Sequence, residues 1–249
     1  MILIPMAGLS QRFTRAGYQL PKYMLEAHGR SLFDQAVLSF AAYFGSLPFL
    51  FVARDVSGTI DFIQARCDAL GITDRRVVAL DAPTRGQAET VALGLTHAQV
   101  ADDEPVTIFN IDTFRPYFAF PRFTDGPTDG YLETFIGEGD NWSFVRPLAE
   151  GSDRAAETSE KRPISSFCCT GLYHFDRARL FRDAYGAAAG LADDQLEAGE
   201  LYVAPLYNSL IAAGCDIRFS VVPRGNVIFC GVPAEYDALL AGPPVYRER

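Results

Sequence analysis

A short loop of mostly small residues follows the first apolar segment of the chain. Residues 7–12 read Ala-Gly-Leu-Ser-Gln-Arg, and a glycine among small polar residues lets backbone N–H groups approach an anion. Arg12 adds a guanidinium that can form paired hydrogen bonds with phosphate. The loop matches neither G-x-G-x-x-G nor the Walker A pattern. On these residues alone, an ordinary strand-to-helix turn is an equally good interpretation.

Basic residues continue beyond this loop. Between residues 12 and 30, a single acid faces four basic residues, which are Arg12, Arg15, Lys22 and Arg30. Only Lys22 and Lys161 are lysines among the 22 basic residues of the chain. Lysine offers a compact point charge where arginine offers a wide planar fork. In a chain of net charge −9, the cluster predicts an anion-binding loop, with a solvated surface loop as the alternative.

Residues 84–87 carry two overlapping signals where a helical pattern begins. Thr84 and Gln87 match a capping box, in which the two side chains bond to backbone N–H groups at the helix start. Gly86 and Gln87 would also let a planar base lie against the loop, with amide and backbone groups contacting its edge. The two interpretations are compatible with each other.

Asp112 directly follows an apolar segment, residues 106–111. A carboxylate at the point where a buried strand leaves the core suits Mg²⁺, which takes one or two carboxylates together with phosphate oxygens. A turn cap is the structural alternative. Ligands of parallel α/β sheets bind beyond the carboxyl ends of the strands. We therefore expect the loops at 6–30, 81–87 and 112–116 to share one edge of a sheet.

Apolar patterns predict the elements that position these residues. The strands expected in the first half are Met1 to Pro5, Phe49 to Ala53, Val77 to Leu80 and Val106 to Ile111. The expected helices are Ser31 to Phe44, capped by Ser31 with Asp34, and two more around residues 60–70 and 88–95. This alternation indicates βαβ units and a mostly parallel sheet, and the continuous apolar strands indicate burial on both faces.

The pattern changes after residue 115. Residues 115–130 predict an ordered loop, and residues 150–162 predict a polar, mobile segment. The strands expected in this half are residues 130–136, 142–147, 164–175, 217–222 and 227–229. The expected helices are residues 201–213 and 235–240. Because no linker divides the chain, we expect one domain over residues 1–249.

Composition excludes several functional classes. With 249 residues, 49% apolar and 21% charged, the chain fits a folded domain rather than a disordered or collagen-like one. The net charge of −9 argues against nucleic acid or an acidic membrane as partner. No apolar run approaches the ~20 residues that span a bilayer, and the N-terminus lacks the basic segment of a signal peptide. Five cysteines without C-x-x-C indicate reduced thiols in a cytoplasmic protein.

In their order along the chain, the motifs resemble the sugar-phosphate nucleotidyltransferases. In the first half, the resemblance rests on Ile4-Pro5-Met6-Ala7-Gly8 with Arg12-Phe13, Pro21-Lys22-Tyr23-Met24, Gly86-Gln87-Ala88 and Asn110-Ile111-Asp112. It continues through Glu160-Lys161, Thr170-Gly171-Leu172-Tyr173-His174-Phe175 and Gly231-Val232-Pro233-Ala234-Glu235-Tyr236. The chain is similar to short bacterial members linked to capsule and surface-polysaccharide synthesis, among them cytidylyl, uridylyl and thymidylyl transferases.

The resemblance implies a fold and a reaction. The fold would be a single Rossmann-like nucleotidyltransferase domain with a mixed, mostly parallel central sheet. Residues 1–115 would form its nucleotide-binding half and residues 116–249 its acceptor-binding half. An acceptor phosphate would attack the α-phosphorus of a nucleoside triphosphate in line, and pyrophosphate would leave. Catalysis would then consist of positioning and charge neutralisation. The partners implied are a nucleoside triphosphate, a phosphorylated small-molecule acceptor and further copies of the chain in a homo-oligomer.

The resemblance also assigns roles to residues. Arg12 would hold the leaving pyrophosphate, Lys22 would offset charge at the α-phosphate and the acceptor phosphate, and Asp112 would hold Mg²⁺. Nucleotide binding would fall to Ala7, Gly8, Leu9, Ser10, Gln11, Gly86 and Gln87. Acceptor binding would fall to Trp142, Glu160, Lys161, Thr170 and Gly171.

The sequence departs from the family pattern at two places. Ser10 and Gln11 replace the second glycine and the hydroxyl residue of the family's glycine loop. Phe229 occupies the place of the family's second metal-binding aspartate, and Asn226, Cys230 or Asp216 are open as substitutes. Two alternatives therefore stay open. One is a nucleotide-sugar-dependent glycosyltransferase, although such an enzyme usually has D-x-D at the end of this strand and this chain has Asp112 alone. The other is a catalytically inactive nucleotide-binding regulator.

Overall fold

The computed structural model describes residues 1–123 and 126–246. The first half of the chain builds a parallel set of strands, which are β1 (Ile2–Met6), β4 (Phe49–Arg54), β5 (Arg75–Leu80) and β6 (Val106–Phe109). β1 lies between β4 and β6, and β5 continues the set beyond β4. The connecting helices are α2 (Leu32–Val37), α3 (Thr59–Leu70) and α4 (Gln87–His97). The predicted βαβ alternation is confirmed.

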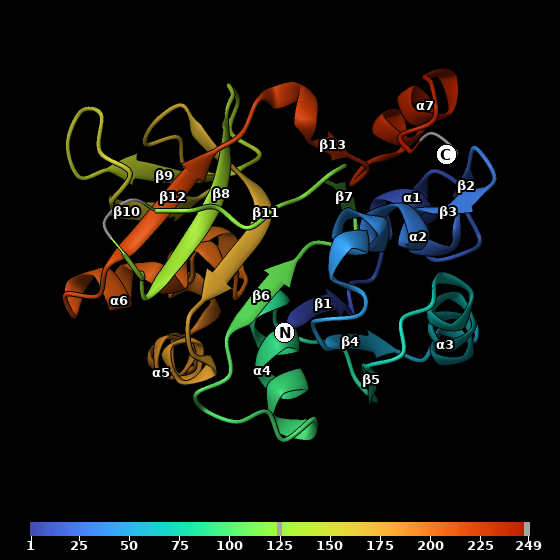
Figure 1. Cartoon of the computed structure of the whole chain (residues 1–249), viewed down its shortest axis with the longest axis horizontal. Coiled ribbons are helices and arrows are strands. Elements are labelled where there is room, and N and C mark those ends of the chain that lie inside the picture. Colours follow the sequence, from blue (N-terminus) through green and yellow to red (C-terminus); the bar gives the residue numbers. More distant parts are fainter. Residues whose placement is uncertain (124–125, 247–249) are drawn as a thin grey trace.

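The second half of the chain extends the same sheet with strands of mixed direction. These strands are β8 (Gly130–Ile136), β9 (Ser143–Pro147), β10 (Ala155–Glu160), β11 (Phe167–Phe175) and β12 (Ile217–Val221). β11 pairs antiparallel with β6, β8 and β9, which joins the two sets of strands. Figure 1 shows β6 and β11 between the two halves of the molecule. The predicted α/β fold with a mixed central sheet is thus confirmed.

Both faces of the central parallel strands β1, β4 and β6 are buried, whereas the edge strand β5 is largely half-buried or exposed. Ile2 and Ile4 of β1 pack on one face with α2 and α3, and Leu3 packs on the other face with α4. The side chains of β4 alternate in the same way. Because each central strand is covered on both sides, its sequence is a continuous apolar run. This packing fixes the carboxyl ends of β1 and β6 side by side, where the site residues begin.

Three sequence-based expectations for the elements need correction. Residues 150–162 are not a mobile segment, because they contain β10, whose polar side chains are buried and hydrogen-bonded; Thr158 Oγ1, for example, donates to the carbonyl of Ala204 at 2.6 Å. The helix expected to end at Phe44 instead continues from α2 as a 3-10 helix, Leu38–Tyr43, with a kink at Phe40. Helix α5 (Ala178–Ala189), which packs against α4, was not expected at all.

Short elements arrange the loops around the carboxyl edge of the sheet. In the N-terminal half they are α1 (Gln11–Arg15), a 3-10 turn at Lys22–Met24, β2 (Glu26–Ala27) and β3 (Arg30–Ser31). Further along the chain they are β7 (Thr113–Phe114), α6 (Tyr207–Ala212), β13 (Ile228–Phe229), α7 (Pro233–Ala241) and the 3-10 turns at Asp193–Gln195, Glu197–Gly199, Ala204–Leu206 and Arg224–Asn226. β13 pairs with β7. Of the loop expected over residues 115–130, residues 124–125 lie outside the described residues.

The last helix returns to the N-terminal half. Figure 1 shows α7 near α1, β2 and β3, and Tyr236 Oη of α7 donates to the carbonyl of Glu26 at 2.7 Å. Within residues 1–123 and 126–246, no helix has the length and hydropathy that crossing a bilayer requires.

Candidate active site

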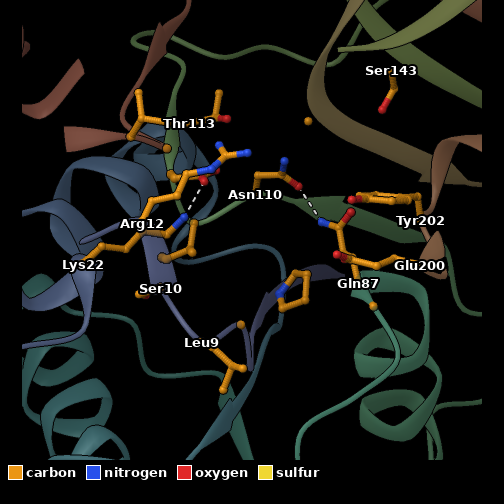
Figure 2. Close-up of a pocket in the computed structure, with 18 of the residues that line it drawn as sticks. Leu9, Ser10, Arg12, Lys22, Gln87, Asn110, Thr113, Ser143, Glu200 and Tyr202 are labelled. Carbon is orange, nitrogen blue, oxygen red and sulfur yellow. Dashed lines mark hydrogen bonds and ion pairs between the residues drawn. The ribbon is translucent and has the colours of Figure 1, made fainter. Parts of the chain in front are cut away.

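A cavity of about 1250 Å³ opens beyond the carboxyl ends of β1 and β6. Every residue assigned a site role from the sequence lines it, except Lys161. Figure 2 shows Arg12 and Lys22 on one side of the cavity, Ser143, Glu200 and Tyr202 on the other, and Asn110 and Gln87 between them. We refer to the first side as the cationic end (Arg12, Arg15 and Lys22). The second is the acidic end (Glu138, Glu160 and Glu200).

The loop after β1 has a backbone shape that suits an anion. Ser10 adopts the left-handed conformation, with φ 50° and ψ 30°, and its side chain forms no capping hydrogen bond to α1. Within the described part of the chain, the N–H groups of Leu9 and Ser10 donate to no backbone acceptor. Successive N–H groups at a left-handed residue form a concave anion site. Arg12 is exposed beside this loop, so it can add a charged donor.

An ion pair joins the two predicted catalytic side chains Lys22 and Asp112. Lys22 Nζ lies 2.5 Å from Asp112 Oδ2, and both side chains are largely shielded from solvent, at 18% and 24% exposed. The next residue, Tyr23, is buried and its hydroxyl lies 2.8 Å from Thr59 Oγ1. This anchor holds Lys22 at the mouth of the cavity.

The segment before α7 closes around Asp112. The N–H of Cys230 donates to the carbonyl of Asp112 at 2.7 Å. Glu235 Oε2 accepts from the N–H groups of Gly231 and Val232, at 2.7 and 3.2 Å. Asp112 therefore stands where β6 ends and where the C-terminal segment crosses it, and its backbone is held from both sides.

Gly86 and Gln87 lie at the start of α4, as the base-binding interpretation requires. A Cβ at Gly86 would lie 2.6 Å from the carbonyl oxygen of Leu201, so only glycine fits this contact. Gln87 Nε2 donates to Asn110 Oδ1 at 2.5 Å, which leaves the amide oxygen of Gln87 available. The expected capping box between Thr84 and Gln87 is wrong.

The start of α4 is capped in another way. Gly86 is the N-cap and offers no side chain, while Glu89 Oε2 accepts from the N–H of Arg85 at 2.5 Å. Thr84 Oγ1 instead lies 2.8 Å from Thr90 Oγ1. The side chain of Gln87 donates to Asn110 and forms no cap at the start of the helix.

Residues 189–202 lie against this loop. The N–H of Ala88 donates to the carbonyl of Leu201 at 2.8 Å, and the N–H of Leu201 donates to the carbonyl of Arg85 at 2.9 Å. The guanidinium of Arg85 donates to the carbonyl of Ala189 and to the carboxylate of Asp193. This segment brings Glu200 and Tyr202 into the cavity.

Glu160 is the most enclosed carboxylate of the acidic end, at 7% exposed. Its Oε2 accepts from the hydroxyl of Ser143 on the adjacent strand β9. Burial raises the pKa of this carboxyl above its ordinary value. Its backbone N–H donates to Glu197 Oε2 at 2.5 Å, which ties β10 to the segment 189–202.

Lys161 does not face the cavity. It occupies a left-handed turn position with φ 54°, and its Nζ donates to the hydroxyl of Tyr202 at 2.6 Å. The ammonium also lies 4.8 Å from the centre of the Tyr202 ring. Lys161 thus acts on the lining of the cavity through Tyr202.

Thr170 and Gly171 lie on β11, where it bulges between its neighbours. Gly171 has φ 94°, and a Cβ there would lie 2.5 Å from Asn110 Nδ2, so a larger residue would displace that amide. Thr170 Oγ1 donates to Glu133 Oε1 at 3.0 Å, and its carbonyl accepts from Thr113 Oγ1 at 3.1 Å. The carbonyl of Gly171 accepts from the N–H of Asn110 at 3.0 Å, so the two residues hold the chain on either side of Asp112.

A buried ion pair continues this support. Arg115 Nε and Nη2 donate to the two carboxylate oxygens of Glu133, at 2.6 and 2.9 Å. Arg115 Nη1 donates to the carbonyl of Asn226 at 2.7 Å. The pair therefore links the strand that follows Asp112, the strand β8 and the turn before β13.

Aromatic rings form the wall between the two ends. Trp142 and Phe229 both line the cavity, with ring centroids 4.7 Å apart. Phe135 packs edge-on against Trp142 at 5.1 Å. The indole N–H of Trp142 donates to the carbonyl of Glu138 at 3.1 Å, which fixes the ring.

Solved structures resemble the whole chain. A nucleoside-diphosphate-sugar pyrophosphorylase from Vibrio cholerae RC9 shares 51% sequence identity with it at a TM-score of 0.92, over 97% of this chain and 100% of that one. The chain belongs to the nucleoside-diphosphate-sugar pyrophosphorylases, which are sugar-phosphate nucleotidyltransferases. Membership of this pyrophosphorylase family confirms the predicted family and enzyme class, nucleotidyltransferase, over the glycosyltransferase alternative.

More distant structures share the pyrophosphorylase fold. An inositol-1-phosphate CTP transferase from T. maritima aligns at 14% identity and a TM-score of 0.71, over 96% of this chain and 94% of that one. A UTP-bound UGPase from Acinetobacter baumannii aligns at 14% identity and a TM-score of 0.67, over 96% and 91%. The sequence matches no protein-family model and no curated protein.

This pyrophosphorylase has one carboxylate at the expected metal position. Asp112 Oδ2 bonds to Lys22, and no described residue donates to Oδ1. Phe229, at the family's second carboxylate position, packs on Trp142. None of the three candidate substitutes lines the cavity. Asp216 is bound to Arg218, Asn226 lies in an exposed turn, and Cys230 is a buried thiol whose pKa burial raises to about 12.

The donor set nevertheless fits Mg²⁺ in one mode. The described residues hold no group of three or more His, Cys, Asp or Glu side chains that could bind a metal ion. Mg²⁺ is commonly held by one carboxylate, with water and substrate phosphate oxygens completing its shell. Asp112, with a free oxygen facing the cavity, meets that requirement.

Sequence reasoning gave no role to several residues of the cavity lining, among them Glu138, Glu200 and Tyr202. Glu200 and Tyr202 carry no motif and reach the cavity only because residues 189–202 fold back over α4. Glu138 belongs to a glycine-rich stretch that gave no chemical signal. Asn110 and Glu235 were within quoted motifs, and the polar residue at the end of an apolar strand was the available signal for Asn110.

Proposed function

We propose that this pyrophosphorylase joins a nucleoside triphosphate to a phosphorylated small molecule and releases pyrophosphate, with Mg²⁺ as its cofactor. The observation that carries the proposal is the Lys22–Asp112 pair at 2.5 Å, next to unpaired backbone N–H groups and within one cavity with Glu160. A cation, a carboxylate and an anion-binding loop are what phosphoryl transfer needs, since little covalent chemistry falls to the protein.

Each end of the cavity takes one part of the reaction. The loop at residues 7–11 and Arg12 would hold the triphosphate and then the leaving pyrophosphate. Gly86 and Gln87 would contact the base. Lys22 would stabilise charge on the α-phosphate and on the acceptor phosphate, which electrostatic groups of this kind do most effectively when preorganised. The halves 1–115 and 116–249 would thus divide nucleotide binding from acceptor binding.

Asp112 would hold Mg²⁺. When bound, the ion would neutralise phosphate charge as the transferred group develops it. Lys22 shares the carboxylate, so it would orient Asp112 as well as contact phosphate. At the acceptor end, Trp142, Glu160, Thr170 and Gly171 would shape the subsite, and Lys161 would position Tyr202.

The nucleotide-linked product would serve synthesis of a capsule or other surface polysaccharide in the cytoplasm. The similarity of the motifs to short family members with that role supports the use of the product. All five cysteines are free thiols, which supports the cytoplasm as the compartment. A transferase with this product fits an acceptor cavity that is open to small phosphorylated molecules.

Ligand-induced stabilisation tests the nucleotide half. CTP, UTP, dTTP, GTP and ATP are each added with and without Mg²⁺, and the melting temperature is measured. A ligand at about 100 times its Kd adds about 2.7 kcal/mol, so one triphosphate should raise the melting temperature clearly. Pyrophosphate release is then measured with a panel of phosphorylated acceptors.

Asp112→Asn tests the metal ligand, because it removes the charge of the side chain and keeps its shape. It should retain the fold and lose Mg²⁺-dependent turnover. Stabilisation by a triphosphate without turnover on any acceptor would favour the inactive regulator. Full activity of Asp112→Asn with unchanged metal dependence would remove Asp112 as the ligand.

A further inference from the structure

The buried carboxylate of Glu160 lacks a donor that balances its burial. It is 7% exposed, and one oxygen accepts from Ser143. Within residues 1–123 and 126–246, no protein group donates to the other oxygen, although Glu160 lines the cavity. Burying a carboxylate is costly unless it is paired or hydrogen-bonded. We therefore expect the ligand of this subsite to donate a hydrogen bond to the second carboxylate oxygen of Glu160.

The other charges at this end are of the same sign. Glu138 and Glu200 line the cavity there, and neither side chain has a hydrogen-bond or ion-pair partner in the described chain. The nearest lysine, Lys161, is bound to Tyr202 and does not line the cavity. Arg85 is bound to Asp193. Lys161 keeps its positive charge, because Tyr202 is a neutral phenol, and it acts on Glu160 from behind the lining. Among the described residues, a ligand at the acidic end therefore meets three carboxylates, while the two nearby cations, Lys161 and Arg85, already have hydrogen-bond partners.

The aromatic wall adds a second attraction for positive charge. Trp142 and Phe229 line the cavity beside Ser143, the partner of Glu160. The faces of aromatic rings attract cations. Phe229 already makes one such contact, because the guanidinium carbon of Arg224 lies 5.1 Å from the centre of its ring. Arg224 does not line the cavity, so this contact is made outside it.

We propose that the acceptor is a phosphomonoester that also carries a positively charged nitrogen. The inference rests on the proposed nucleotidyl transfer and names its acceptor class. The phosphate would lie at Lys22 and the nitrogen at Glu160 and the aromatic wall. Opposite charges at the two ends of the cavity would orient such a zwitterion in one direction.

The nitrogen takes no part in the bond changes. One oxygen of the acceptor phosphate forms a bond to the α-phosphorus of the triphosphate. The bond from that phosphorus to the oxygen bridging to the β-phosphorus breaks, and its electron pair leaves with pyrophosphate. Glu160 therefore determines which acceptor binds and not how the phosphorus reacts.

Acceptor pairs that differ only in the nitrogen test the inference. Glucosamine 1-phosphate is compared with glucose 1-phosphate, and O-phosphoethanolamine with 2-hydroxyethyl phosphate. Binding is measured by calorimetry, and pyrophosphate release is measured with the triphosphate that stabilises the protein. In at least one pair, the amino acceptor should bind more tightly and show kcat/KM about tenfold higher, because paired charges in a desolvated site are worth that much or more.

Glu160→Gln separates charge from shape. The amide can still accept from Ser143, so the variant should lose the amino acceptor's advantage through KM while the hydroxyl acceptor changes by less than about threefold. Glu150→Gln, in an exposed turn, is the control and should change neither.

Two results overturn the inference without touching the proposed function. In the first, amino acceptors do not exceed their hydroxyl partners in binding or turnover in either pair. In the second, Glu160→Gln weakens both members of a pair equally. Either result would show that Glu160 binds hydroxyl groups of the acceptor and not a charged nitrogen. The proposed function fails separately, by the absence of any triphosphate response in the melting measurement.

Discussion

The two ends of the cavity are built in opposite ways. At the cationic end, loops that follow parallel strands bring backbone N–H groups and the Lys22–Asp112 pair together. At the acidic end, antiparallel strands and the segment 189–202 bring carboxylates and rings together. Figure 2 shows Asn110 and Gln87 between the ends, joined by their amide hydrogen bond.

The difference in construction matches the difference in proposed roles. Phosphoryl transfer needs a cation and an anion-binding backbone, and the loops of the cationic end supply both. The acceptor would bind at the acidic end, where Glu200 and Tyr202, which carry no motif, join the quoted Glu160 in the lining. Three buried residues, Arg115, Glu133 and Thr170, connect the ends.

The largest effect is expected for the ion pair that connects the ends. Arg115→Met removes one partner of a buried bidentate pair and leaves Glu133 uncompensated. Breaking such a pair costs about 4 kcal/mol, so urea unfolding should show a loss of that size. Arg146→Met breaks the Arg146–Glu157 pair, in which Arg146 is half exposed, and should cost at most about 1 kcal/mol. Equal losses in the two variants would show that the Arg115 pair has no special role.

The next effect belongs to the cationic end. Lys22→Ala should lower kcat at least about a hundredfold, because Lys22 would stabilise the transferring phosphoryl group. Arg179→Ala removes an exposed cation that, among the described residues, forms an ion pair only with Asp183 on the same helix, and it should leave kcat unchanged. Steady-state pyrophosphate release measures both. A near-normal rate for Lys22→Ala would exclude the assigned role and leave the cationic end as a binding surface alone.

The sequence predicted the cationic end better than the acidic end for a physical reason. Residues 7–12, Lys22 and Asp112 directly follow strands with strong apolar patterns, so their place at the sheet edge followed from the βαβ alternation. β10 carries buried Thr158, Ser159 and Glu160, whose polarity resembled a mobile loop. The side-chain partners of Thr158 and Glu160, which are Ala204 and Ser143, lie outside the segment 150–162, so the segment alone does not reveal them.

Local capping signals had mixed success for the same reason. Ser31 and Asp34 form the predicted capping box, with both bonds inside one turn. Gln87 leaves its predicted cap because Asn110, at the end of another strand, offers a partner. Asp34 keeps its cap although Arg66 also donates to its carboxylate, because the carboxylate has acceptor sites for both. A local motif fails where a tertiary partner takes the side chain away from the helix end, as Asn110 does with Gln87.

A smaller effect is expected from pH at the acidic end. Burial raises the pKa of Glu160 above the ordinary value of 4.5, so the folded protein binds this proton more tightly than the unfolded chain does. That contribution to stability is complete below pH 4.5 and is lost as pH rises through the folded pKa.

Glu160→Gln cannot lose a proton, so its stability should fall less than that of the unsubstituted protein as pH rises above 4.5. Urea unfolding at a series of pH values, without ligand, measures the difference. Parallel pH dependences of the two proteins would show that solvent in the cavity already balances the charge, and would weaken the contrast between the two ends.

The smallest effect is expected at Ser10, where the cationic end departs from the family's glycine loop. Ser10 holds φ 50° without a capping bond. Glycine would relieve a left-handed strain of about 1 kcal/mol and lose a similar amount through greater freedom of the unfolded chain. Ser10→Gly should therefore change the free energy of unfolding by less than about 1 kcal/mol and leave kcat unchanged.

Ser10→Val, whose β-branched side chain disfavours this conformation, should raise the KM of the triphosphate. If Ser10→Gly lowers kcat instead, the serine hydroxyl itself contacts phosphate, and the cationic end depends on a side chain that its backbone geometry does not reveal.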